Sequence, residues 1–300
     1  MKDILVIGGA TGVGKSDVAV ACALQLNGEI ISADSMQVYR GFDIGTAKIK
    51  DTEMAGVPHY MIDIADPNDT FTVADYKKRA IECVEDIKAR GKLPIVCGGT
   101  GLYINSLLYQ MSYSGKLDPV LRARLNEELA EKGKEFMHDK LSRLNPEAAM
   151  RLHVNDTKRV LRAIEKALTG GETENDFEKP LYSYKMYVME RARRELYERI
   201  DRRVDAMIEN GLLDEVTKMI KSGVESTSQA MQAIAYKEWA LSLSYEKTVL
   251  LIKKNTRNYA KRQITWFKQY KDAKHIEMGG RAPSEIAAEI VQDYKKDDVE

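Results

Sequence analysis

An eight-residue segment near the N-terminus has the composition of a phosphate-binding loop. Residues 9–16 read GATGVGKS, which is glycine, four residues, glycine, lysine and serine. Such glycines let the backbone curl so that successive N–H groups point inward, and the following helix adds the positive end of its dipole. Lys15 adds a positive charge, and the Ser16 hydroxyl can bind Mg²⁺. The residues that form this predicted cradle are Gly9, Ala10, Thr11, Gly12, Val13, Gly14, Lys15 and Ser16.

The cradle alone does not identify its ligand. A nucleotide hydrolase or kinase usually has a second apolar strand that ends in an Asp, which manages Mg²⁺. Residues 93–97, LPIVC, are followed by GGTG without an acid, whereas YMIDIADP places Asp63 and Asp66 after an apolar run. A nucleotide and another phosphate-bearing molecule are both compatible with these residues.

A second polar segment follows the apolar residues 29–33. Residues 32–48 read SADSMQVYRGFDIGTAK, and Asp34 comes just after the predicted strand. An acid at that place can act as a general base or accept a hydrogen bond from an amine. It can also simply cap a helix. Position alone favours neither role.

Alternating elements must position these residues. Short β-branched runs at 4–7, 29–33 and 93–97 predict buried strands, and residues 17–26 and 72–90 have the composition and spacing of helices. The segment GGTGLYINSLLY, residues 98–109, indicates a glycine turn into a further helix. This alternation predicts an α/β fold with a parallel sheet, whose ligands bind at the carboxyl ends of the strands.

The composition changes after about residue 114. Charged helical segments dominate residues 118–170, residues 170–180 read as a polar loop, and residues 184–190 as a strand that returns to the sheet. Residues 193–222 indicate a long helix, or a helix pair broken near Gly211. We expect a P-loop NTPase-like parallel sheet flanked by helices. Its core comprises residues 1–114 and 185–300 with C-terminal helices, and residues 115–184 form an inserted all-helical domain.

Composition excludes some classes of protein. The 300 residues contain 46 basic and 46 acidic side chains, so overall charge indicates no partner. No apolar run is long enough to cross a bilayer, and the N-terminal run is too short for a signal peptide. The cysteines, Cys22, Cys83 and Cys97, are scattered, which argues against a disulfide framework or a zinc site. We therefore expect a cytoplasmic protein with no membrane partner.

Local charge is uneven near the C-terminus. Residues 253–274 carry eight basic residues and one acid. On a helix, Lys254, Arg257, Lys261 and Lys268 share a face, with aromatic side chains roughly opposite: Tyr259, Trp266, Phe267 and Tyr270. A solvated charged face over an aromatic core is one interpretation. Contact with a phosphate backbone is favoured for the basic face, because so dense an excess is unusual in a neutral chain.

Six separated blocks resemble one enzyme family. In order they are GATGVGKS, DSMQVYRGFDIGTAK, GGTGLY, NDTKRVLRAIE, LYERIDRRVDAMIENGLLDEV and YAKRQITWF. Together they span nearly the whole chain and closely resemble the tRNA isopentenyltransferases, the IPP transferase family of tRNA dimethylallyltransferases. Members transfer a dimethylallyl group from its diphosphate to the N6 amine of adenosine 37, just 3′ of the anticodon, in tRNAs that read codons starting with U. The product is N6-(dimethylallyl)adenosine.

The resemblance implies roles for individual residues. The cradle of residues 9–16 would bind the diphosphate of dimethylallyl diphosphate, although the motif type is that of ATP-binding proteins. Lys15 would neutralise this diphosphate, and Ser16 would help hold the cofactor Mg²⁺. Asp34 would be the general base, and Thr100 would steady the leaving diphosphate. The family also implies a monomer.

The resemblance further implies a tRNA partner, bound through its anticodon stem-loop. In the N-terminal half, the implied contacts are Asp34, Ser35, Met36, Gln37, Thr100, Arg122, Lys158, Arg159, Val160, Leu161 and Arg162. In the C-terminal half they are Gln232, Ala233, Ile234, Ala235, Tyr236, Lys237, Lys261, Arg262, Gln263, Ile264, Thr265, Trp266, Phe267 and Lys268. Salt bridges along a helix are the alternative for any single arginine of residues 158–162.

Three positions depart from the family pattern. Ala10 and Gly12 stand where Pro and Ala are usual, and Ala235 stands where Gly is usual. Amide cradling needs neither P-loop side chain, so a looser but functional loop is expected. At Ala235 the local backbone geometry is in question.

Two other functions are compatible with the residues. A small-molecule or nucleotide kinase would turn over ATP and would require Asp63 or Asp66. An RNA-binding protein with a vestigial P-loop would keep its RNA affinity after loss of Asp34 or Lys15.

Overall fold

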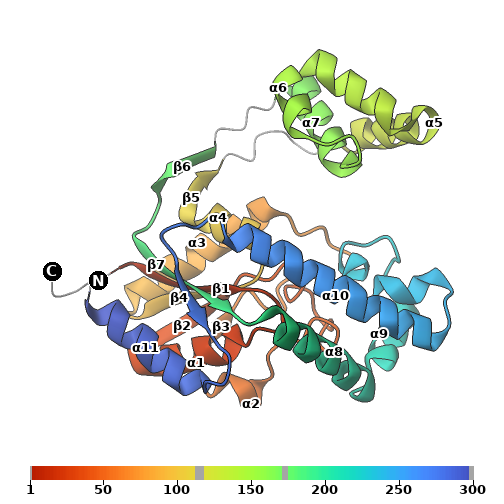
Figure 1. The fold of residues 1–300 in the computed structure, drawn as a ribbon. Coiled ribbons are helices and arrows are strands. Elements are labelled where there is room, and N and C mark those ends of the chain that lie inside the picture. Colours follow the sequence, from red (N-terminus) through yellow and green to blue (C-terminus); the bar gives the residue numbers. More distant parts are fainter. Residues whose placement is uncertain (1, 112–117, 171–174, 297–300) are drawn as a thin grey trace. The chain divides into compact units, whose positions relative to one another are not determined.

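The computed structural model describes residues 2–111, 118–170 and 175–296 (Figure 1). The chain folds into two compact units. A core unit comprises Met1–Tyr109 and Pro180–Glu300, and an inserted unit comprises Gln110–Lys179. The sequence placed the insertion at residues 115–184, and its first boundary lies outside the described residues.

A six-stranded parallel sheet forms the centre of the core unit (Figure 1). Its order is β3 (His59–Tyr60), β2 (Gly28–Ser32), β4 (Leu93–Gly98), β1 (Ile4–Gly9), β7 (Tyr184–Glu190) and β8 (Lys274–Glu277). In register, Val6 of β1 pairs with Val96 of β4 on one side and Met186 of β7 on the other. The parallel sheet predicted from sequence is therefore confirmed, although β3 and β8 were not predicted.

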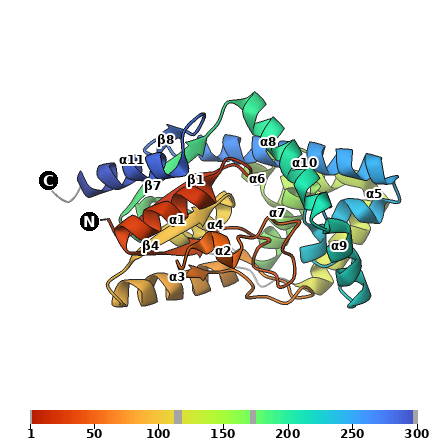
Figure 2. The same cartoon turned by 90° about the horizontal axis from the view of Figure 1, so that it is seen from below.

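Helices cover both faces of this sheet, so β1 is buried along its whole length (Figures 1 and 2). Ile4 and Val6 pack in one hydrophobic cluster with α3 (Val73–Ala89) and α4 (Gly101–Leu108). Leu5 and Ile7 pack in the other cluster, with α1 (Lys15–Leu26) and α11 (Pro283–Lys296). This alternation follows from the period of two in a strand.

Four further helical segments belong to the core unit. They are α8 (Arg193–Glu209), α9 (Leu212–Lys221), α10 (Tyr245–Phe267) and the short α2 (Asp51–Met54). Two 3₁₀ turns, η1 (Ala230–Gln232) and η2 (Lys237–Leu241), precede α10. Gly211, with φ +92°, separates α8 from α9 as the sequence predicted. Helix α10 ends at Phe267, earlier than the basic segment that we treated as helical through residue 274.

The inserted unit has its own small core. Its helices are α5 (Pro119–Leu144), α6 (Pro146–Arg151) and α7 (Thr157–Thr169), and Gly133 interrupts α5 with φ +82°. Leu125, Leu141 and Ile164 are among the residues of its hydrophobic cluster. In addition to these helices, β5 (Tyr109–Met111) pairs with β6 (Asn175–Pro180) in a two-stranded sheet. The polar loop predicted at 170–180 is thus wrong for residues 175–180, where strand pairing satisfies the backbone, and residues 171–174 lie outside the described residues.

No helix within residues 2–111, 118–170 and 175–296 is both long and apolar enough to cross a membrane.

Candidate active site at the carboxyl edge of the sheet

Loops after three neighbouring strands meet at one edge of the sheet. The loop after β1 is the P-loop, in which Gly9, Gly12 and Gly14 have φ of +146°, +80° and +104°. These values favour glycine and allow the tight turn into α1, which begins at Lys15. The loops after β2 and β4 touch each other, because the Thr100 amide donates to the Ala33 carbonyl at 3.0 Å. The structure therefore brings together the P-loop, the Asp34 segment and Thr100, which the sequence singled out separately.

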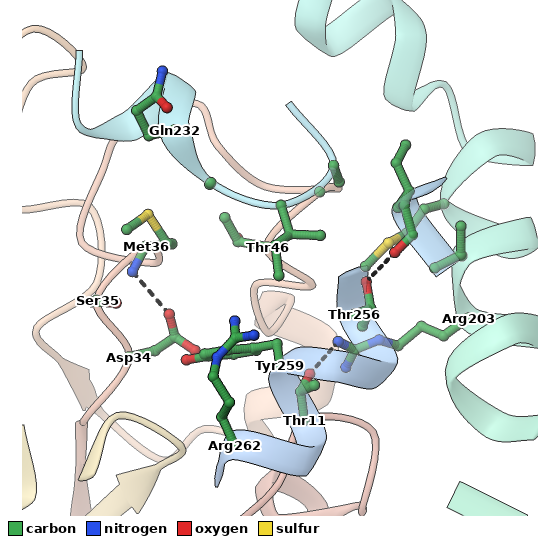
Figure 3. A pocket seen from close by; sticks show the side chains of 17 residues that line it. Thr11, Asp34, Ser35, Met36, Thr46, Arg203, Gln232, Thr256, Tyr259 and Arg262 are labelled. Carbon is green, nitrogen blue, oxygen red and sulfur yellow. Dashed lines mark hydrogen bonds between the residues drawn. The ribbon is translucent and has the colours of Figure 1, made fainter. Parts of the chain in front are cut away.

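One carboxylate oxygen of Asp34 orders its own loop. Asp34 Oδ1 accepts the Met36 amide at 2.9 Å and the Gln37 amide at 3.4 Å (Figure 3). The other oxygen, Oδ2, has no hydrogen-bond partner among the described residues. Asp34 thus caps a turn with one oxygen and leaves the second available, and its role as a general base stays a prediction.

A central pocket of about 230 Å³ opens beside Asp34 (Figure 3). Polar side chains line one part of it: Thr11, Asp34, Arg203, Tyr259 and Arg262. The rest of the lining is mixed: it includes the apolar residues Met36, Val204, Met207, Ile234 and Ile252 and the polar residues Ser35, Thr46, Gln232 and Thr256. A small planar or branched group with both polar and apolar parts fits such a lining.

Two further spaces, a small pocket and a wider cleft, adjoin the P-loop. A small pocket contains Lys15, Ser16, Asp34 and Gln37, so Asp34 lines both this pocket and the central pocket. A wider P-loop cleft of about 500 Å³ is lined by Lys15 and Ser16 on one side and by arginines of α8 on the other. Arg203 lines both the cleft and the central pocket, and so marks where the two adjoin.

Arginines from α8 and the residues before it hold the P-loop. Arg191 Nε donates to the Val13 carbonyl at 2.9 Å, and Arg199 Nε donates to the Gly12 carbonyl at 3.1 Å. Arg203 Nη2 donates to Thr11 Oγ1 at 2.6 Å (Figure 3). Sequence reasoning missed these arginines, although Arg199 and Arg203 are spaced i, i+4 and therefore share one face of a helix.

The positive charges at this edge are only partly compensated. Arg203 Nε is buried and has no hydrogen-bond partner in the described part of the chain. Burial lowers the pKa of Arg203, and the charge of Asp34 opposes that shift. Burial likewise lowers the pKa of Lys15. Half-buried cations, one of which has an unused buried donor, favour an anionic ligand at this place.

Two residues of α10 lie close to the P-loop and the central pocket: Gln263 contacts the P-loop, and Tyr259 lines the pocket. Gln263 Oε1 accepts the Thr11 amide at 2.8 Å, and Gln263 Nε2 donates to the Gly99 carbonyl at 3.0 Å. This side chain joins the P-loop to the residue before Thr100. Burial raises the pKa of Tyr259 to about 12, and the charge of Asp34 adds to the rise. Tyr259 therefore stays a neutral phenol that can donate a hydrogen bond.

Comparison with known proteins identifies the family. The IPP transferase family matches residues 37–270. This chain belongs to the IPP transferase family. Proteins named tRNA dimethylallyltransferase are similar to it over most of its length. The one from Clostridioides difficile is 45% identical over 285 residues, which cover 92% of this chain and 91% of the relative. The one from Thermoanaerobacter sp. is 47% identical over 280 residues, 89% of each chain.

Solved structures agree with this membership in the IPP transferase family. The full-length tRNA isopentenylpyrophosphate transferase from Bacillus halodurans is 39% identical, has a TM-score of 0.75 and covers 99% of this chain and 96% of its own. A eukaryotic dimethylallyltransferase acting on tRNA is 26% identical and has a TM-score of 0.79. The match covers 99% of this chain and 80% of the eukaryotic chain. The resemblance and the P-loop NTPase-like fold inferred from sequence are both confirmed.

The residues of α10 that the family resemblance assigned to tRNA divide by exposure. Lys261, Arg262, Thr265 and Lys268 are exposed, whereas Gln263 and Phe267 are buried. Ile264 and Trp266 are half-buried. Arg262 lies over the ring of Tyr259, 5.6 Å from its centroid. Exposed cations of this helix can reach a nucleic acid, but the buried side chains support the P-loop and the sheet instead.

Part of the predicted basic face is neutralised within the protein. Arg257 forms an ion pair with Asp201 of α8, and Lys253 pairs with Asp205 at 2.6 Å. Arg257 is therefore already engaged by an acid of α8, and contact of the basic face with a phosphate backbone stays a prediction. Lys254 is exposed.

The segment 232–237 forms one wall of the central pocket. Gln232, Ala233, Ile234 and Ala235 line it, while Tyr236 is fully buried behind them. Lys237 is half-buried. Ala235 has φ +80°, a left-handed conformation that disfavours any residue with a Cβ. The departure from Gly noted in the sequence therefore falls on a strained residue, and Gly12 has the same φ where the family has Ala.

In the inserted unit, two of the assigned residues share an acid. Arg122 Nη2 donates to Glu165 Oε2 at 2.6 Å, and Arg162 Nη1 donates to the same oxygen at 3.1 Å. Glu165 is 3% exposed. Lys158 and Arg159 are exposed, whereas Val160 and Leu161 belong to the small core. The helix salt bridges considered from sequence are thus present at Arg162, and Val160 and Leu161 serve packing.

The two acids that favoured a kinase are engaged elsewhere. Lys48 Nζ donates to Asp63 Oδ1 at 2.5 Å, and Asp66 pairs with Arg40 at 2.5 Å. Neither acid lines the central pocket, the small pocket or the P-loop cleft. The hypothesis of a kinase therefore loses the acids on which it depended.

Proposed function

We propose that this chain is a tRNA dimethylallyltransferase. It transfers the dimethylallyl group of dimethylallyl diphosphate to the N6 amine of adenosine 37 in tRNAs that read codons starting with U. The observation that carries the proposal is the place of Asp34, which lines both the small pocket beside Lys15 and Ser16 and the central pocket. The names of similar proteins support it.

The diphosphate would bind at the P-loop. Its oxygens would accept hydrogen bonds from the loop amides and would interact with the positive charges of Lys15 and Arg203. The buried Nε of Arg203 has no other partner among the described residues. In the reaction the allylic C–O bond breaks, and its electron pair leaves with the diphosphate. Cations fixed where this negative charge develops stabilise the transition state more than the ground state.

The central pocket would receive the two reacting groups. Its apolar lining suits the five-carbon chain, and the adenine would leave its stack in the anticodon loop to enter. The N6 nitrogen forms the new N–C bond and loses one proton. The free Oδ2 of Asp34 would accept this proton, while Oδ1 keeps the carboxylate oriented through Met36. Thr100, tied to the Ser35 amide, would keep the leaving diphosphate beside Asp34.

We also propose Mg²⁺ as the cofactor, with Ser16 as a ligand. Among the described residues, no group of three or more His, Cys, Asp or Glu side chains could hold a metal ion. Ser16 and Asp17 open onto the P-loop cleft, and Mg²⁺ usually keeps waters and binds one or two protein groups plus substrate phosphates. The residues therefore fit an ion that arrives with the diphosphate and neutralises part of its charge. The monomeric state and the cytoplasmic location stay predictions.

One assay separates this function from its alternatives. The protein is incubated with radiolabelled dimethylallyl diphosphate and an anticodon stem-loop that has adenosine at position 37. Label enters the RNA if the proposal is right, and a stem-loop with guanosine at that position stays unlabelled. Consumption of ATP without labelling would indicate a kinase. Binding of the stem-loop without any labelling would indicate an RNA-binding protein with a vestigial P-loop.

A further inference from the structure

We infer that Glu215 is a positioning residue that holds two walls of the central pocket together. Its carboxylate accepts the backbone amides of Asp43 at 3.1 Å, Ile44 at 2.8 Å and Gly45 at 3.1 Å. It also accepts the hydroxyl of Tyr236 at 2.5 Å. Glu215 does not itself line the pocket, so it acts through these two segments. The inference rests on the function proposed above.

The first wall is the loop between β2 and α2. Gly45 and Thr46 of this loop line the central pocket together with Arg203 and Val204. The turn is closed internally by Thr46 Oγ1, which donates to the Phe42 carbonyl at 2.6 Å. The three amides that follow Phe42 all point to Glu215 in the first turn of α9. One charged acceptor therefore sets the place of the whole turn.

The second wall is the segment before η2. Tyr236 follows directly on Ala235, and its ring packs against Phe42 with centroids 4.6 Å apart. Its hydroxyl also accepts the Gly45 amide at 3.1 Å. A Cβ at Gly45 would lie 2.4 Å from Tyr236 Cε2, so the two walls touch here at glycine. Any shift of Tyr236 moves Ala235 and the pocket lining with it.

The Tyr236 hydroxyl keeps its proton in this contact. Burial, and then the charge of Glu215, raise the pKa of Tyr236 well above its ordinary range. Tyr236 therefore keeps its proton and continues to donate to the carboxylate. The pair holds the loop 42–46 against the segment 232–236.

The test compares Glu215→Gln with Asp214→Asn in the full chain. Both variants remove one negative charge from the first turn of α9, but Asp214 is exposed and takes no part in the loop contacts. We expect Glu215→Gln to lower kcat for RNA labelling about 10- to 100-fold, since small displacements of reacting groups have effects of that size. Affinity for inorganic pyrophosphate at the P-loop should stay within about twofold of the unaltered chain, and Asp214→Asn should match the unaltered chain in both.

A structural readout accompanies the kinetics. In Glu215→Gln, hydrogen exchange at the amides of Asp43, Ile44 and Gly45 should become faster, while the amides of β1 keep their protection. Tyr236→Phe retains the ring and removes one donor, so it should give the same pattern to a smaller degree. This variant keeps the inference testable if Glu215→Gln does not fold.

Several results would overturn the inference. One is wild-type turnover in Glu215→Gln, or in Tyr236→Phe if the first variant is unfolded. Another is loss of turnover together with an equal loss of pyrophosphate affinity and of protection in β1, which would indicate general destabilisation. Failure of the unaltered chain to label RNA would instead count against the proposed function, so the two failures are distinguishable.

Discussion

The hydroxyl of Thr100 accepts a hydrogen bond from the backbone amide of Ser35 at 3.1 Å. This contact joins the loop after β4 to the loop that carries Asp34. Thr100→Ala removes the acceptor and leaves the amide unsatisfied, which costs about 1–3 kcal/mol. Turnover should fall, and Thr100→Ser should restore most of it because the oxygen returns. Steady-state labelling of the stem-loop measures both, and equal activity in the alanine and serine variants would contradict the prediction.

Asp34→Asn tests the base directly. Asparagine keeps an oxygen that can accept the Met36 amide, so the loop should hold its shape. It cannot accept the N6 proton, and turnover should fall by about 10²- to 10⁴-fold. Stem-loop affinity, measured by fluorescence anisotropy, should change far less. A loss of affinity as large as the loss of turnover would argue against a base.

Arg203 supplies buried positive charge where the diphosphate is proposed to bind. Arg203→Gln should lower turnover by about 10²-fold, since a donor to developing negative charge is lost. It should also weaken binding of inorganic pyrophosphate in isothermal titration. Arg202→Gln is the matched control, because Arg202 lines the P-loop cleft but not the central pocket. Similar losses in both variants would mean that the site senses overall charge rather than Arg203.

Ala235 stores backbone strain at φ +80°. Glycine has no Cβ penalty there, so Ala235→Gly should raise the free energy of unfolding by about 1 kcal/mol. Ala233 has φ −63° and ψ 150°, which suit alanine, so Ala233→Gly should lower it. Urea denaturation of the two variants gives the comparison. If Ala235→Gly does not raise the free energy of unfolding, or if Ala233→Gly raises it as well, the prediction of strain specific to Ala235 is contradicted.

The sequence predicted the site wherever local patterns decide it. The glycines of the P-loop, Asp34 and Thr100 each follow a recognisable strand, and parallel strands end at the same edge of the sheet. The partners of these residues are not local. Arg203 and Thr11 are 192 residues apart, and Gln263 and Thr11 are 252 apart. Periodicity can place such residues on a helix face, but only the packed fold shows which loop that face meets.

The exposed cations of α10 provide a test of the RNA surface. Lys261→Ala and Arg262→Ala should each weaken stem-loop binding and reduce the slope of log affinity against log salt by about 0.7–0.9, if each contacts one phosphate. Arg257→Ala is the control, because the positive charge of Arg257 is already compensated by its ion pair with Asp201. Its slope should match that of the unaltered chain.

The salt slope counts released counterions. It therefore separates direct phosphate contact from a general loss of stability, which would weaken binding without changing the slope. An unchanged slope in Lys261→Ala and Arg262→Ala would remove this face of α10 from the interface and leave RNA binding to the other exposed cations, among them Lys158 and Arg159.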